Sequence, residues 1–159
     1  MIVDRMRGVF ACAIGLTMAL GAAGSVASAQ SQAALIVQND RGGLIGARAR
    51  EISDLNARDI QVQLRGRICY SSCTMYLGAE QVCVDPETIF GFHGPSQRGR
   101  ALPPDRFEHW SAVMAGHYNA PLRDWFLSEA RHRISGYYRI SGASLIALGY
   151  QACSGNPDG

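Results

Sequence analysis

Three groups of residues in this chain have types that could perform acyl-transfer chemistry. Ser71 and Ser72 follow a predicted strand and open a short apolar helix, and a helix N-terminus stabilises developing negative charge. His93 follows a later predicted strand and is a candidate general base. Gly42 and Gly43 end an earlier strand, and no side chain obstructs their backbone N–H groups. The same residues also have structural interpretations, as a helix cap, a strand-end histidine and a tight turn.

The first 29 residues have the pattern of an export signal. Arg5 and Arg7 precede an uncharged run from Gly8 to Gly24, and Ala27-Ser28-Ala29 has the small-x-small pattern of a cleavage site. The alternative is an uncleaved membrane anchor, but the run is short for a span and rich in Gly and Ala. We therefore expect a secretory signal over residues 1–29, a periplasmic or secreted protein, and one domain over residues 30–153, followed by a disordered tail over residues 154–159.

Four cysteines lie after the predicted signal, namely Cys69, Cys73, Cys83 and Cys153, the first two of which bracket the serine pair. An even number of cysteines in an exported chain predicts two disulfides, with three possible pairings. We expect them to tie the helix that begins at the serines to the Cys83 strand or to the C-terminus. The C-x3-C spacing is not that of a C-x-x-C redox pair, and without a second close pair it predicts no metal site. No cofactor is expected.

The charge pattern excludes several classes of partner. All fifteen basic residues are arginine, they are scattered singly or in pairs, and thirteen acidic residues nearly balance them. Such a pattern is not typical of nucleic-acid binding or of attachment to an acidic membrane surface. No apolar stretch after the predicted signal is long enough to span a membrane.

The elements that must position these groups begin with a strand–helix–strand unit. Residues 35–38 are apolar and partly β-branched, and Ile45, Ala49, Ile52 and Leu55 recur at helical spacing. Residues 60–64 then alternate apolar and polar, as a strand covered on one face does. Active groups of such units lie at the carboxyl ends of parallel strands, so residues 39–43 and 66–72 are the loops expected to carry a site.

The second half of the chain predicts two short strands followed by helices. Residues 82–84 and 89–92 have strand composition, and a Gly- and Pro-rich loop over residues 94–104 follows His93. Arg98 and Arg100 border that loop and could meet a substrate. A capping box formed by Asp105 and Glu108 is expected to open a helix with a core-facing Phe107, Trp110, Met114 and His117. Further helices are expected to start at Asn119 and at Ser141 or Gly142.

The order and spacing of these motifs resemble the Clp-protease and crotonase superfamily. The matching segments are Asn39-Asp40-Arg41-Gly42-Gly43, Cys69-Tyr70-Ser71-Ser72-Cys73-Thr74 and Gly91-Phe92-His93. Within it, the chain looks closest to a group of bacterial exported proteins with a Cys-x-Ser-x-Cys-Thr motif, a Gly-Phe-His motif and a C-terminal cysteine. The resemblance implies an α/β fold, a minimal Clp/crotonase-like spiral of ββα units, in which oligomers are common. It also implies Ser71 as nucleophile, His93 as general base, and the N–H groups of Gly43 and Ser72 as an oxyanion hole.

The chain departs from the family at the third member of the catalytic triad. Clp proteases have an aspartate where this chain has Tyr137 or Tyr138, so an orienting carboxylate would have to come from Asp85, Asp105 or Asp124. Two functions follow from this gap. The first is an exported serine hydrolase that cleaves peptide or other acyl bonds with a Ser–His pair. The second is a non-catalytic periplasmic protein that binds a peptide or a partner on the same frame.

Overall fold

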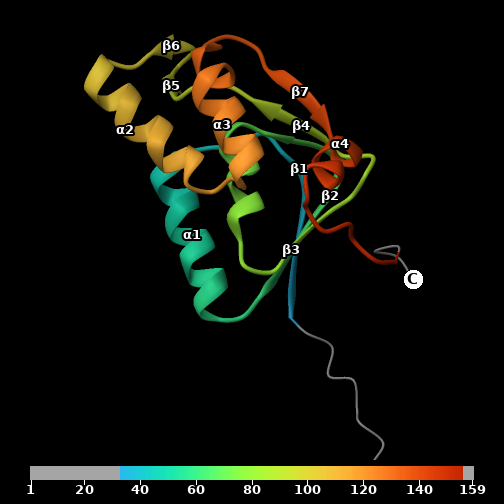
Figure 1. The fold of residues 1–159 in the computed structure, drawn as a ribbon. Coiled ribbons are helices and arrows are strands. Elements are labelled where there is room, and N and C mark those ends of the chain that lie inside the picture. Colours follow the sequence, from blue (N-terminus) through green and yellow to red (C-terminus); the bar gives the residue numbers. More distant parts are fainter. Residues whose placement is uncertain (1–32, 156–159) are drawn as a thin grey trace, which may run out of the picture. The chain divides into compact units, whose positions relative to one another are not determined.

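The structure is a computed structural model that describes residues 33–155, and it is a mixed α/β fold (Figure 1). The strands are β1 (Ala34–Asp40), β2 (Gln61–Tyr70), β3 (Val82–Val84), β4 (Ile89–Phe92), β5 (Ser96–Gln97), β6 (Arg100–Ala101) and β7 (Tyr138–Ser141). The helices are α1 (Ile45–Ala57), α2 (Pro104–Ala115), α3 (Ala120–Ser128) and α4 (Gly142–Ala147), with 3-10 helices η1 (Ser71–Gly78) and η2 (Ala130–His132). The predicted signal over residues 1–29 lies outside the described residues.

One five-stranded sheet organises the fold, with β2 at its centre. Its strand order is β1-β2-β4-β7, and β3 also pairs with β2. The pairs of β2 with β1, β3 and β4 are all parallel, whereas β7 runs antiparallel to β4. In Figure 1, helices α1, α2 and α3 lie on the same side of this sheet. The predicted strand–helix–strand unit is therefore present as β1, α1 and β2.

Strand β2 changes its partner halfway along its length. Its first half pairs with β3 through residues 62–64, and its second half pairs with β4 through residues 68–70. Between them Gly66 has φ +83°, a value that glycine adopts without strain. The prediction that the strand ends near residue 64 and that residues 66–72 form a loop is wrong, because β2 passes through Gly66 with a shift of register against β1 and does not end there. The strand continues to Tyr70 and leads directly into η1.

The core forms where α1, η1 and the later helices pack on the sheet. Ile52 and Leu55 of α1 are buried, as their helical spacing predicts, and Phe90, Phe92 and Phe126 are fully buried. Each buried side chain of this size contributes about 1.5–3 kcal/mol of hydrophobic free energy. The same core fixes the positions of β2 and β4, which carry the candidate site at their ends.

The C-terminal segment is held against the sheet by a buried arginine. The guanidinium of Arg65 donates to the carbonyl oxygens of Ser154 and Gly155 at 3.0 Å each, and the Cys153 amide donates to Val84. The predicted disordered tail starts at Ser154, but Ser154 and Gly155 are hydrogen-bonded to Arg65 of β2 and are therefore ordered. Residues 156–159 lie outside the described part of the chain.

Helix starts agree with the sequence at two of three positions. The side chain of Asn119 accepts a hydrogen bond from the Leu122 amide, and that of Ser141 accepts one from the Ser144 amide. The predicted capping box is wrong, because α2 begins at Pro104 and has no side-chain cap. Asp105 lies in the first turn of α2, where the positive end of the helix dipole stabilises its negative charge.

Candidate active site

Ser71 occupies the turn between β2 and η1 in a strained backbone conformation. Its φ is +58°, a value that non-glycine residues rarely adopt. The hydroxyl of Thr74 donates to the Ser71 carbonyl oxygen at 2.7 Å, and the Tyr118 hydroxyl lies 2.7 Å from the same Thr74 oxygen. Because the single hydroxyl hydrogen of Thr74 is used toward Ser71, Tyr118 must be the donor in the second bond. This buried pair holds the turn that exposes the Ser71 side chain.

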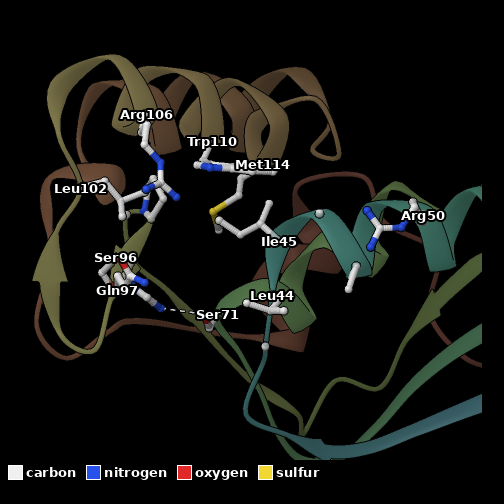
Figure 2. Close-up of a pocket in the computed structure, with 16 residues that line it drawn as sticks. Leu44, Ile45, Arg50, Ser71, Ser96, Gln97, Leu102, Arg106, Trp110 and Met114 are labelled. Carbon is white, nitrogen blue, oxygen red and sulfur yellow. Dashed lines mark hydrogen bonds between the residues drawn. The ribbon is translucent and has the colours of Figure 1, made fainter.

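His93 lies within hydrogen-bond distance of Ser71. Its Nε2 is 2.8 Å from Ser71 Oγ, the bond drawn as the dashed line at Ser71 in Figure 2. The register of the sheet explains this contact. Tyr70 of β2 pairs with Gly91 of β4 in parallel, so the residues just beyond both strands emerge at the same edge. The two residues predicted as nucleophile and base are therefore adjacent in space.

Burial sets the protonation state of His93. The imidazole is mostly removed from solvent, which lowers its pKa below the usual 6.5, while the main chain at Gly94 opposes this shift to a smaller extent. A lowered pKa keeps His93 neutral near pH 7. Its ring meets the Tyr137 ring edge to face, with the centroids 5.2 Å apart. A neutral imidazole whose proton is on Nδ1 has an unprotonated Nε2, which can accept the hydroxyl proton of Ser71.

The two glycines after β1 differ in what they provide. Gly42 has φ +92°, and an ideal Cβ there would lie only 2.6 Å from the Cβ of Ser71, so only glycine lets this loop approach the serine. Its amide donates to Asp40 Oδ1 at 2.6 Å, and Asp40 also binds Arg48 at 2.6 Å. Gly43 has open space around its Cβ position and lines the same pocket as Ser71. The Gly43 amide makes no hydrogen bond within the described part of the chain.

The structure separates the roles open to Ser71 and Ser72, which the sequence alone does not. Ser71 lines the pocket, whereas Ser72 is fully buried beneath it. The Ser72 hydroxyl has no hydrogen-bond partner among the described residues. A buried hydroxyl cannot reach a substrate, so any contribution of Ser72 must come from its backbone N–H.

No carboxylate of the described residues reaches the second nitrogen of His93. Nδ1 is buried and unpaired among residues 33–155. Asp85 accepts the Glu87 amide, Asp124 pairs with its neighbour Arg123, and Asp105 lies in α2. Spacing alone does not show which of these candidates could orient His93, and the structure excludes all of them in this arrangement.

An aromatic stack takes the space beside the imidazole instead. Of the two tyrosines that stand where Clp proteases have an aspartate, Tyr137 contacts His93, whereas Tyr138 packs on Trp125. The Tyr137 ring also lies 4.6 Å from the Tyr70 ring, between centroids. Nothing in the sequence pattern indicates this stack, because it joins the end of β2, the residue after β4 and the residue before β7.

A pocket of about 350 Å³ opens beside Ser71 and His93. One wall is the start of α1, another is the loop after His93, and a third is α2 (Figure 2). Trp110 and Met114 of α2 face Ile45 of α1 across it (Figure 2). The sequence predicts Trp110 as a core residue, whereas the structure leaves it half-buried on the pocket wall. Arg106 lines this pocket, and Arg98 and Arg100 do not.

The disulfides pair differently from the expectation. Cys69 bonds to Cys73, and Cys83 bonds to Cys153. The expected link from η1 to β3 or to the C-terminus is therefore wrong. Residue 69 ends up beside residue 73 because the turn at Ser71 reverses the chain, with the two Cα atoms 5.3 Å apart. The first bond closes the short segment that holds Ser71, and the second ties β3 to the C-terminal segment.

Two further structural findings concern metal binding and membrane insertion. The described residues contain no group of three or more His, Cys, Asp or Glu side chains placed to hold a metal ion. None of their helices has the length and apolar character to cross a membrane.

Replacing Gly94 by alanine should lower the free energy of unfolding by about 3 kcal/mol, at the upper end of overpacking effects. An ideal Cβ on Gly94 would overlap the carbonyl oxygen of Arg131. The Gly94 amide donates to the Arg133 carbonyl at 2.9 Å, so the two segments cannot separate without losing that bond. Urea unfolding measures the change. Gly43→Ala is the control, because its Cβ meets open space; equal effects of the two variants would contradict the packing seen at Gly94.

Comparison of the chain with protein-family models and with curated proteins gives no match.

Proposed function

We propose that this protein is a serine hydrolase that cleaves peptide or other acyl bonds, with Ser71 as nucleophile and His93 as general base. The observation that carries the proposal is the 2.8 Å contact between His93 Nε2 and Ser71 Oγ at the edge of a pocket. The positive φ of Ser71 supports it, because strained residues on a strand-to-helix turn recur at nucleophiles. A serine that only caps a helix, or a histidine that only ends a strand, requires neither the 2.8 Å contact nor a positive φ.

The reaction would start with proton transfer from Ser71 to His93. Ser71 Oγ attacks the substrate carbonyl carbon while its proton moves to His93 Nε2, giving a tetrahedral oxyanion. The C–N or C–O bond to the leaving group then breaks, and His93 returns the proton to that group. Water attacks the resulting acyl-enzyme by the same route and releases the acid.

The oxyanion would be held by backbone amides of Gly43 and Ser72. Gly43 has an unbonded amide within the described residues and lies just before α1, whose positive dipole end faces the pocket. Donors of this kind, fixed before the reaction, contribute about 100- to 1,000-fold each to the rate. Asp40 restrains the loop by binding both the Gly42 amide and Arg48.

We further propose that the fold is a minimal Clp/crotonase-like spiral and that the protein is exported. The order of the Gly-Gly, Ser and His motifs supports the fold, together with three neighbouring parallel strands that present them at one edge. Two disulfides support export, because such bonds persist in oxidising compartments. A periplasmic or secreted location is compatible with both.

One observation favours the alternative function, a non-catalytic binding protein. His93 Nδ1 has no carboxylate partner among the described residues. In the chymotrypsin triad, changing the orienting aspartate lowers kcat by about four orders of magnitude. A frame that has lost this group could retain the pocket for binding a peptide or a partner, and covalent labelling of the serine separates the two functions.

The test is labelling of the purified, disulfide-bonded protein with a fluorophosphonate. We expect labelling of the wild type and of Ser72→Ala, and loss of labelling in Ser71→Ala. Ser72→Ala is a matched control, since it removes the neighbouring hydroxyl and leaves the backbone N–H. Absence of wild-type labelling at every pH from about 6 to 9 would instead support the binding protein.

The pH dependence of labelling should show the lowered pKa of His93. Below its pKa the imidazole is protonated and cannot accept the Ser71 proton, so the rate should rise with pH and level off. Burial lowers the pKa from 6.5, which places the midpoint of that rise below 6.5. The labelling rate measured from about pH 4.5 to 8 gives the midpoint; a value at or above 6.5 would show that the base is not a buried His93.

A further inference from the structure

The pocket beside Ser71 contains two unpaired arginines and no carboxylate. Arg50 of α1 and Arg106 of α2 both line it, and none of its lining residues is Asp or Glu. Neither arginine forms an ion pair within residues 33–155, whereas Arg48, on the same helix as Arg50, binds Asp40 and Glu51. The positive charge in this pocket is therefore left without an internal partner.

The two guanidinium groups line different ends of the pocket, with Trp110 and Met114 between them (Figure 2). Figure 2 shows the Arg106 side chain extending from α2 toward Leu102, on the side of the pocket that holds Ser71. An ideal Cβ on Gly46 would lie 3.6 Å from Arg50 Nη1 and 3.2 Å from the Trp110 ring. The Arg50 side chain thus folds back along α1 toward its first turn, beside the Trp110 ring.

The start of α1 adds to the positive potential. The helix has 13 residues, no acidic residue in its first turn, and an N-cap, Leu44, that provides no side-chain hydrogen bond. Gly43 and the first residues of α1 all line the pocket. Uncapped amides at a helix N-terminus favour a bound anion. Together with Arg50 on the same helix, they favour an anion on this side of the pocket, and Arg106 adds a second positive charge beside Leu102.

The lining between the two arginines is apolar, whereas Ser96 and Gln97 of the loop after His93 contribute polar groups. Ile45, Trp110 and Met114 line the pocket between the arginines, and Leu44, which is 81% exposed, lies at the mouth. A surface of this kind favours a ligand with an apolar body and a negative group, rather than a neutral polar or a cationic ligand. A volume of about 350 Å³ suits a peptide segment of a few residues.

We propose that the substrates are peptides that carry a carboxylate close to the bond that is cleaved, with Arg106 as the main residue that selects them and Arg50 as a second, separate positive charge at the far end of the pocket. This inference rests on the proposed hydrolase function. A bidentate contact between a guanidinium and a carboxylate selects Glu over the isosteric Gln, because the amide of Gln carries no charge and matches the guanidinium donors less well. Arg50 and Arg106 are both exposed, and ion pairs of exposed side chains are weak, so we expect about 3- to 10-fold selectivity.

The test uses two peptides as competitors of fluorophosphonate labelling at Ser71. Acetyl-Ala-Ala-Glu-Ala-amide and its Gln counterpart differ only in the charged group. We expect the Glu peptide to protect wild-type Ser71 at concentrations about 3- to 10-fold lower than the Gln peptide. This ratio should fall to near one in Arg106→Gln, fall less in Arg50→Gln, and stay at the wild-type value in Arg100→Gln, an exposed arginine outside the pocket.

The outcomes separate this inference from the function on which it rests. Failure of wild-type labelling contradicts the hydrolase. Binding of the same two peptides to a Ser71→Ala, Trp125→Phe double variant, in which Trp110 is the one remaining tryptophan, can then be followed by fluorescence and still tests the charge preference. Equal protection by the two peptides, no protection by either, or a Glu preference that persists in an Arg106→Gln, Arg50→Gln double variant would overturn the inference. Because the ratio compares two peptides on one variant, a change in the amount of folded protein does not alter it.

Discussion

Replacing His93 by alanine is expected to lower the rate of Ser71 labelling by about three orders of magnitude or more, the scale of losses seen when a nucleophile's base is removed. His93 Nε2 is 2.8 Å from Ser71 Oγ. Within the described residues no other histidine lines the pocket, so no second imidazole can replace it. The serine of the variant would have to react without a base to accept its proton.

The control for this prediction is His132→Ala, which removes an exposed histidine outside the pocket. Its labelling rate should stay within a factor of about two of the wild type, as surface substitutions cause small changes. Because His93→Ala also opens a space beside Tyr137, His93→Gln provides a second variant that fills more of it. Labelling of both His93 variants within tenfold of the wild type would show that Ser71 reacts without this imidazole, contrary to the proposed mechanism.

Removing the Cys83–Cys153 disulfide should lower the free energy of unfolding by about 4 kcal/mol, as loop-closure entropy predicts for a long loop. The two cysteines are 70 residues apart in sequence, so the bond restricts most of the unfolded domain. Single domains have total stabilities of about 5–15 kcal/mol, so a loss of this size removes a large share. Urea unfolding of a Cys83→Ala, Cys153→Ala double variant measures it.

The matched comparison is the Cys69→Ala, Cys73→Ala double variant. Its cysteines are only 4 residues apart, so the same entropy relation gives about 2 kcal/mol. Its effect on labelling should be the larger of the two, because Cys69 and Cys73 close the turn that holds Ser71 at φ +58°. Equal losses of stability in the two double variants, or a labelling defect confined to the Cys83–Cys153 variant, would contradict these assignments.

Local patterns in the sequence predict much of the framework. The spacing of Ile52 and Leu55 predicts α1, and Asn119 and Ser141 predict the starts of α3 and α4, because caps and helical faces depend on residues within a few positions. The end of β2 could not be predicted in this way. Glycine often interrupts a strand, and here the pairing of β2 with β1, β3 and β4 lets the strand continue through Gly66.

In the candidate site, too, some features follow from local sequence motifs and others depend on long-range contacts. The motifs around Ser71 and His93 single out both residues, but their contact depends on the register of β2 against β4, which is a long-range property. The choice of Ser71 over Ser72 depends on which hydroxyl the turn exposes. Arg106 carries no motif at all, and it becomes a candidate only because α2 packs across the start of α1.

By itself, then, the sequence determined the residue types available for the chemistry, the local elements that carry them and the number of cysteines that can pair. The tertiary structure decided which of these meet. It paired Cys69 with Cys73, put Tyr137 rather than a carboxylate beside His93, and left Arg50 and Arg106 without acidic partners in the described part of the pocket. The physical reason is that caps and amphipathic faces arise from neighbours along the chain, whereas contacts between strand ends arise from sheet register and helix packing, which no local pattern encodes.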